Sequence, residues 1–215
     1  MLALKIISTV LISYFLGNIS SARIISKIIH QDITKKGSGN PGTMNMARNF
    51  GIKLGFLTLF CDALKGVISA LIGFSIFGFG TINGYIGLYI AGISVIIGHC
   101  FPVIYKFKGG KGVACAIGVF AVSNPIVLAI AFVISAIYLY IWDYGVISSL
   151  IVITSLVVVE GIRFRGVLPI SILLFCIFML IWSVHYKNFY RLLVGRENKI
   201  NFRKMLKKID KKNRK

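Results

Sequence analysis

The stretch GVISALIGFSIFGFGTINGYIGLYIAGISVIIGHCFPVIY, residues 66–105, contains no Asp, Glu, Lys or Arg. A membrane-spanning helix needs about 20 predominantly apolar residues, so this stretch is long enough for most of two spans. The sequence Gly78-Phe79-Gly80-Thr81 predicts a turn near its middle. The stretch therefore predicts two helices that cross a bilayer one after the other.

The whole chain has the composition of a membrane protein. Of its 215 residues, 57% are hydrophobic and 14% are charged, and the mean hydropathy is +0.85. Soluble domains are about 45–50% apolar and about 25% charged. A soluble fold of this length could not keep so much apolar surface from water, which excludes a soluble globular enzyme and a disordered chain.

Further apolar runs on both sides of this stretch predict the remaining helices. The first run ends at Ser20-Ser21-Ala22 and could also be a cleaved signal peptide, but its length favours a retained helix. Run 113–122 is too short for a full span and predicts a half-height or tilted helix inside the bundle, after which Pro125 begins a new helix. The predicted helical runs are 6–22, 52–77, 84–105, 113–122, 125–142, 144–159 and 167–184.

These runs predict an all-α fold, a polytopic integral membrane bundle of about seven transmembrane helices. If the short segments are re-entrant, five of them are complete spans. Residues 1–200 are expected to form a single transmembrane domain, and residues 201–215 a basic cytoplasmic tail. Because both counts are odd, the two termini are expected on opposite sides of the membrane.

The charge distribution predicts the orientation. The chain has 25 Lys and Arg against 6 Asp and Glu, a net charge of +19. Loops 26–51 and 106–112 and the tail carry the excess cations, so we expect them on the cytoplasmic side and the N-terminus outside; Arg163 and Arg165 are a local exception. The tail is expected to be attracted to anionic lipid headgroups. No stacking motif or fold signature supports nucleic acid as a partner.

The first polar motif, residues 37–48, reads GSGNPGTMNMAR. Its glycines and proline impose a tight, non-helical backbone whose amide groups can converge on an anion. Ser38 and Asn40 add neutral polar groups, and Arg48 adds a forked cation suited to phosphate. An ordinary cytoplasmic turn is the alternative interpretation of this loop.

The second motif, residues 98–112, reads GHCFPVIYKFKGGKG. The glycines around Lys111 leave the backbone bare beside a cation, at the start of a helix whose dipole favours negative charge. The Walker pattern is absent because no Ser or Thr follows the lysine and no strand precedes it, so nucleotide binding is not expected. A lysine-rich turn at the membrane interface is the alternative.

The third motif, residues 185–197, contains His185, Asn188, Arg191, Gly195 and Glu197. The first three share one helix face if the last helix continues to about residue 193. A histidine at a helix end is often only a surface residue, but an amide and a guanidinium at helical spacing favour a functional site. Glu197 is expected to be a structural ion-pair partner.

Four carboxyl and amino groups lie within or beside the apolar runs. Asp62 and Lys65 are three residues apart and are expected to neutralise each other inside the bundle, because unpaired charges in a membrane are costly. Asp143 and Glu160 lie near segment ends, where solvent exposure is the simpler expectation. No Cys, His or carboxylate spacing suggests a metal site, and no cofactor is expected.

Together, the three motifs resemble those of the bacterial acyl-phosphate-dependent glycerol-3-phosphate acyltransferases of the PlsY type. Their order and separation also match, as do Ser20-Ser21 and the pair at 62 and 65, and the resemblance extends to about residue 200. It implies a multi-pass enzyme of the bacterial cytoplasmic membrane with its site on the cytoplasmic face. The implied reaction moves a fatty acyl group from acyl phosphate to the sn-1 hydroxyl of glycerol 3-phosphate, giving lysophosphatidate and phosphate.

The resemblance also implies roles for individual residues. The catalytic residues it implies are Ser38, Arg48, His185 and Asn188. The substrate-binding residues it implies are Gly39, Asn40, Asn45, His99, Lys108, Gly109, Gly110, Lys111 and Gly112. Glu197, Asp62 and Lys65 are expected to be structural.

Two further expectations concern partners and the competing function. The substrates, the bilayer and the soluble enzyme that forms acyl phosphate are the expected partners. A membrane transporter for a small phosphorylated anion would use the same basic loops. It would also need polar groups on both faces of the membrane, whereas the polar motifs here are predicted on one face.

Overall fold

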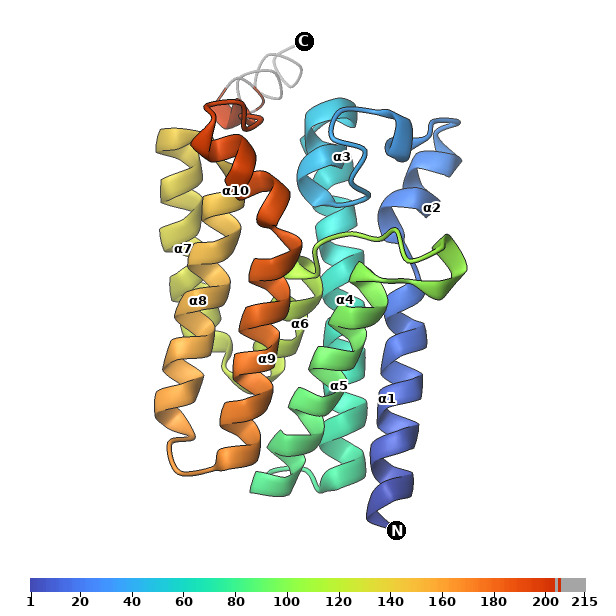
Figure 1. The fold of residues 1–215 in the computed structure, drawn as a ribbon, viewed down its shortest axis with the longest axis vertical. Helices are drawn as coiled ribbons and strands as arrows, with labels where there is room; N and C mark the ends of the chain where they lie inside the picture. The colour runs from blue at the N-terminus through green and yellow to red at the C-terminus, as the bar shows by residue number, and fades with distance from the viewer. Residues whose placement is uncertain (204, 206–215) are drawn as a thin grey trace.

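The computed structural model describes residues 1–203 and 205, and the regular structure of this part is entirely helical. Most of the predicted basic tail, 201–215, lies outside the described residues. In Figure 1 the long helices run along one axis, with α3 and α10 at one end of the bundle and the N-terminus at the other. The helices are α1 (Leu2–Asn18), α2 (Ser21–Ile28), η1 (Ile33–Lys35), α3 (Thr43–Phe50), α4 (Ile52–Phe77), α5 (Ile82–Cys100), η2 (Val103–Tyr105), α6 (Val113–Ser123), α7 (Pro125–Trp142), α8 (Gly145–Arg163), α9 (Leu168–Val184) and α10 (Tyr186–Leu193).

Five described helical segments are long and apolar enough to cross a membrane. A sixth is formed if α9 and α10, which are bent by 51° relative to each other, count as one span. Many side chains on these helices remain apolar and exposed, as a lipid environment requires. The predicted all-α membrane bundle is confirmed, while its orientation and number of complete spans stay predictions.

The short helix α6 is packed inside the bundle, as predicted. Ala116, Val119 and Phe120 are fully buried. A Cβ atom added to Gly66 of α4 would collide with the carbonyl oxygen of Cys115 on α6. The two backbones therefore touch, which is the kind of close approach that small residues permit between membrane helices.

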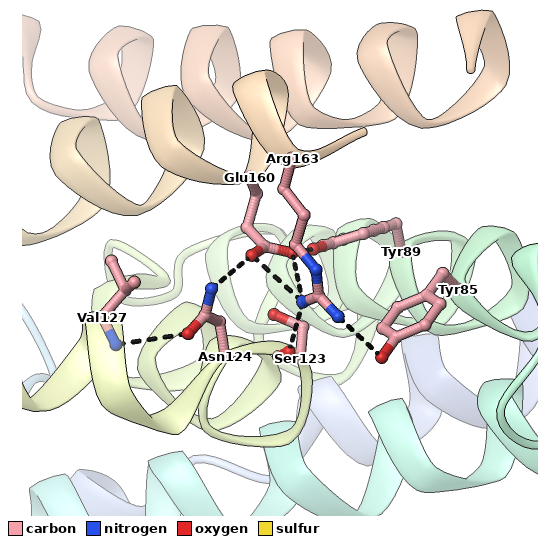
Figure 2. A network of polar contacts seen from close by, with 7 residues as sticks. All are labelled: Tyr85, Tyr89, Ser123, Asn124, Val127, Glu160 and Arg163. Carbon is pink, nitrogen blue, oxygen red and sulfur yellow. Dashed lines mark hydrogen bonds and ion pairs between the residues drawn. The ribbon is translucent and has the colours of Figure 1, made fainter. Parts of the chain in front are cut away.

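A buried polar network centres on Glu160, and the expectation that this residue is exposed is wrong. Its side chain is 0% exposed. Its carboxylate accepts hydrogen bonds from the Tyr89 hydroxyl (2.5 Å) and the Asn124 amide (2.8 Å), and it pairs with Arg163 at 3.3 Å (Figure 2). Asn124 also caps α7 by accepting from the Val127 N–H. The network therefore secures the break between α6 and α7.

Replacement of Glu160 by Ala should destabilise the fold. The change leaves the buried Tyr89 hydroxyl and Asn124 amide without their acceptor, at a cost of about 1–3 kcal/mol each. The thermal unfolding midpoint of the purified protein in detergent should fall by roughly 5–10 °C. Val158→Ala, which trims an exposed side chain of the same helix, is the matched control; equal midpoints for the two variants would contradict the role given to Glu160.

Candidate active site

A cavity of about 400 Å³ brings the three polar motifs together. Its walls come from α3, α4, α7, α8, the start of α6 and the region of α9 and α10. The predicted site residues that line it are Ser38, Asn40, Asn45, Arg48, Asp62, His99, Lys111, Gly112, His185, Asn188 and Glu197. The predicted residues that do not line it are Gly39, Lys65, Lys108, Gly109 and Gly110.

The first motif forms a loop that Asn45 holds in shape. Asn45 is buried, its Oδ1 accepts from the Ser38 N–H at 3.2 Å, and its Nδ2 donates to the Lys36 carbonyl at 3.0 Å. Gly37 and Gly39 adopt positive φ angles of 54° and 70°, which an L side chain rarely adopts. The loop thereby places Ser38 at the cavity and starts α3, which carries Arg48.

The second motif folds back onto the end of α5. The N–H of Gly109 donates to the Cys100 carbonyl (3.1 Å), and the N–H of Gly110 donates to the His99 carbonyl (3.0 Å). A Cβ atom on Gly110 would collide with the His99 imidazole. The bare backbone thus brings the loop against His99, so that Lys111 and Gly112 reach the cavity while Lys108 stays exposed.

The third motif begins at the bend between α9 and α10. His185 lies at this bend, is 2% exposed, and its Nδ1 is 2.6 Å from the Ile181 carbonyl. A carbonyl only accepts hydrogen bonds, so Nδ1 carries the hydrogen and the neutral ring keeps a free electron pair on Nε2. The bend therefore supplies the cavity with a group that can accept a proton.

One hydrogen-bonded chain joins the second and third motifs. Lys111 Nζ donates to Asn188 Oδ1, and Asn188 Nδ2 donates to Glu197 Oε1 at 2.7 Å. Glu197 Oε2 also accepts from Arg191 Nε at 2.8 Å. Glu197 thus orients both an amide and a guanidinium, and its ion pair with Arg191 is present; its assignment as a purely structural residue stays a prediction.

Positive charge exceeds negative charge around these hydrogen-bonded residues. Arg48, Lys111 and Arg191 approach the single carboxylate of Glu197, and Arg48 also donates from Nη2 to the Asn198 carbonyl at 3.2 Å. Within the described part of the chain, the buried Nε of Arg48 and hydroxyl of Thr43 have no hydrogen-bond partner. Such a site favours an anion that brings several acceptor oxygens.

Burial lowers the pKa of Lys111 to about 8. Desolvation is the largest cause; the Glu197 carboxylate opposes it, and the Arg191 and Arg48 guanidinium groups add to it. The amino group is therefore poised to lose its proton just above neutral pH.

A second buried network lies behind the cavity. Lys65 Nζ pairs with Asp62 at 3.0 Å, contacts His99 Nδ1 at 2.9 Å and donates to the Ile19 carbonyl at 2.7 Å. Since an ammonium group only donates, His99 Nδ1 accepts and the hydrogen of the neutral ring is on Nε2. The predicted ion pair of Asp62 and Lys65 is confirmed, and it ties the break between α1 and α2 to the wall of the cavity.

The cavity also contains residues that the motifs did not indicate. Ser148 and Ser149 of α8 line it, as do Ile200, Phe202 and Met205 after the third motif. Isolated serines are common in membrane helices, Ile200 is the last residue of the predicted transmembrane domain, and Phe202 and Met205 fall in the predicted basic tail. Among the described residues, no group of three or more His, Cys, Asp and Glu side chains is placed to hold a metal ion.

Comparison with known proteins assigns the family. Residues 7–195 match the family model described as "Glycerol-3-phosphate acyltransferase". The chain belongs to this family. The glycerol-3-phosphate acyltransferase of Aquifex aeolicus is 36% identical over 198 residues, which cover 91% of this chain and 100% of the relative. The enzyme of Finegoldia magna is 33% identical over 191 residues, covering 88% and 93% of the two chains.

Solved structures of a relative share the fold of this glycerol-3-phosphate acyltransferase. The crystal structure of PlsY (YgiH), an integral membrane glycerol 3-phosphate acyltransferase, in its glycerol 3-phosphate form is 33% identical, with a TM-score of 0.84 and coverage of 94% of this chain and 98% of the relative. Its lysophosphatidic acid form has a TM-score of 0.80 at 34% identity, covering 90% and 94%. The protein is thus an integral membrane acyltransferase.

The pKa of Lys111 predicts a pH dependence. If its ammonium group binds the acceptor's phosphate, kcat/KM for glycerol 3-phosphate should fall as pH rises through about 8, because the cation is lost. An initial-rate profile between pH 6.5 and 9.5, roughly spanning this pKa, measures the fall. Lys111→Arg, which stays charged over this range, should flatten it; an unchanged profile in the arginine variant would assign the fall to another group.

The contact between the second motif and His99 predicts the effect of Gly110→Ala. The added methyl group collides with the imidazole and displaces the loop beside Lys111, so KM for glycerol 3-phosphate should rise more than kcat falls. Gly161→Ala is the matched control, since a Cβ atom there meets nothing within 4 Å. A loss of kcat at unchanged KM would show that the loop does not position the acceptor.

Proposed function

We propose that this acyltransferase takes its acyl group from acyl phosphate and transfers it to the sn-1 hydroxyl of glycerol 3-phosphate, giving lysophosphatidate and inorganic phosphate. The observation that carries this proposal is the meeting of Arg48, Lys111 and Arg191 around one carboxylate, beside the free Nε2 of His185. Both substrates are phosphate anions, and an excess of cations is what two such groups side by side require.

The acceptor is proposed to bind through its phosphate at the second and third motifs. Lys111 and Arg191 supply charge, and Asn188 fixes the direction of the lysine. The two crystal structures of the relative, its glycerol 3-phosphate form and its lysophosphatidic acid form, support a site that holds an acceptor and its acylated product in turn. Ser38 and Arg48 of the first motif are proposed to bind the donor's phosphate.

In the proposed reaction the acceptor's hydroxyl oxygen attacks the donor's carbonyl carbon. A carbon–oxygen ester bond forms, and the bond between the carbonyl carbon and the phosphate oxygen breaks. We propose that His185 Nε2 accepts the proton of the attacking hydroxyl group. The departing phosphate then takes up this proton. Phosphate is a good leaving group, so positioning of the two substrates can supply much of the rate.

The acyl chain accounts for a site inside a membrane protein. The cavity has apolar walls from α4 and α7, including Phe56, Leu59, Phe132 and Leu139. An amphiphilic donor can keep its phosphate among the cations and its chain among these side chains. We propose that the site faces the cytoplasm of a bacterial cell, where glycerol 3-phosphate and the soluble enzyme that forms acyl phosphate would supply it.

Release of inorganic phosphate from palmitoyl phosphate tests the donor. The purified protein in lipid vesicles should release phosphate and form lysophosphatidate when glycerol 3-phosphate is added, and should not use palmitoyl-CoA. Uptake of glycerol 3-phosphate into sealed vesicles without product formation would instead indicate a transporter. Activity with palmitoyl-CoA alone would overturn the proposed donor.

Replacement of Arg48 by Lys should remove most of the activity. A lysine keeps the charge but cannot make the forked contact that a phosphate accepts from a guanidinium, so kcat/KM should fall by about 10²-fold, a loss of roughly 2.7 kcal/mol. Arg165→Lys, an exposed residue beyond α8, is the matched control. Near-normal activity of the Arg48 variant would remove this residue from the donor site.

A further inference from the structure

The segment after the third motif closes one side of the cavity. We call residues 198–203 the C-terminal strap; it begins beyond the part that the family model matches, 7–195. Its first residue, Asn198, accepts a hydrogen bond from Arg48 of α3. Ile200 and Phe202 of the strap both line the cavity.

Asp143 fastens the strap at the turn between α7 and α8. Its carbonyl accepts from the Ile200 N–H at 3.0 Å, and its Oδ1 accepts from the Phe202 N–H at 2.7 Å. Asp143 has a φ of 62°, the left-handed conformation, which turns both acceptors toward the strap. Solvent exposure is the simpler expectation for Asp143, but the structure shows that it also bonds to the strap.

Ile200 bridges the two sides of the cavity. It is only 4% exposed. A Cβ atom added to Gly145 at the start of α8 would lie 2.6 Å from Ile200 Cδ1 and 3.4 Å from Met44 of α3. The strap is thus packed between α3 and α8, which fixes the position of the residue that follows.

Phe202 lies at the boundary between the cavity and the outer surface of α7. A second, open hollow lies on that surface and is lined by Phe132, Val133, Ala136, Ile137, Tyr140, Ile141 and Phe202. Phe132, Ala136 and Phe202 line both the hollow and the cavity. Val133 and Ile137 are more than half exposed in a helix long and apolar enough to span a membrane. The shared residues therefore mark where the cavity meets lipid.

We propose that Phe202 forms the membrane-side edge of the donor site and contacts the acyl chain where the chain leaves the cavity for the bilayer. This inference rests on the proposed function and adds a specificity-determining residue to it. A chain whose phosphate lies among the cations must continue into apolar surroundings, and the edge shared by Phe202 and α7 joins the two regions. Asp143 is the positioning residue, because it holds the backbone of Phe202.

Photo-cross-linking tests the contact without requiring turnover. The photoreactive residue p-benzoylphenylalanine is placed at position 202, and at position 175 as a control, because Phe175 of α9 is exposed and lines neither hollow. In phosphatidylcholine nanodiscs, oleoyl lysophosphatidate should label position 202 saturably, and excess unlabelled lysophosphatidate should compete. Labelling at 202 that matches position 175 and rises without saturation would overturn the proposal.

Donor selectivity tests the consequence of the contact. Phe202→Ala should change the ratio of kcat/KM for stearoyl phosphate to that for lauroyl phosphate by at least about threefold, since a pocket distinguishes chains by their apolar contacts. Asp143→Gly tolerates the left-handed conformation but lacks the carboxylate, so it should shift the ratio in the same direction. Asp143→Asn keeps both the conformation and the Oδ1 acceptor and should retain the parent ratio.

The cross-linking and donor-selectivity experiments together distinguish a failure of this inference from a failure of the proposed function. A uniform fall in kcat for both donors, at an unchanged ratio, would show that the strap is only structural and would overturn the inference. If palmitoyl phosphate is no substrate of the parent protein, the proposed donor fails, and the cross-linking comparison still decides whether Phe202 contacts an acyl chain.

Discussion

The excess of cations around Glu197 is the constraint on which the site depends. One carboxylate orients Asn188 and Arg191, and through the amide it also fixes Lys111. Bringing these cations together in a partly desolvated cavity is unfavourable without a counter-charge, and burial lowers the pKa of Lys111 accordingly. A ligand with several anionic oxygens would supply this counter-charge.

Two buried ionic networks let the helices break where the site requires it. A helix that ends inside a bilayer leaves polar groups that no water can satisfy. At the break between α1 and α2, Lys65 donates to the carbonyls of Gly17 and Ile19. At the break between α6 and α7, Asn124 caps the new helix and Glu160 holds Asn124. Because these ends are satisfied, α6 can stop short and carry the second motif into the cavity.

The sequence predicts the features whose causes are local. Uncharged runs indicate the helices, Pro125 marks the start of α7, and glycines beside Lys111 indicate a loop that can approach an anion. The spacing of Asp62 and Lys65 predicts their ion pair, because one turn of helix brings them together. The three polar motifs all contain cations, and their order along the chain resembles that of a known family. These two features allow the motifs to be assigned to one site from the sequence alone.

Other features could not be predicted because their partners are distant in sequence. Glu160 looks like an interfacial residue until packing places Tyr89, 71 residues away, against it. The strap crosses the predicted boundary between the transmembrane domain and the basic tail, and nothing local in Ile200 or Phe202 indicates Asp143 as a partner. Ser148 and Ser149 resemble many other helix serines. In each case tertiary packing, rather than local pattern, assigns the residue to the site.

The cavity joins segments that lie far apart in the sequence: Arg48 bonds to a carbonyl 150 residues further along. During synthesis, the first motif leaves the ribosome well before the residues that complete its surroundings. A nascent chain that has already inserted α1 to α8 still lacks His185, Asn188 and Glu197. The cavity is therefore completed only after the third motif has been synthesised, so a chain that stops after α8 lacks one of its sides.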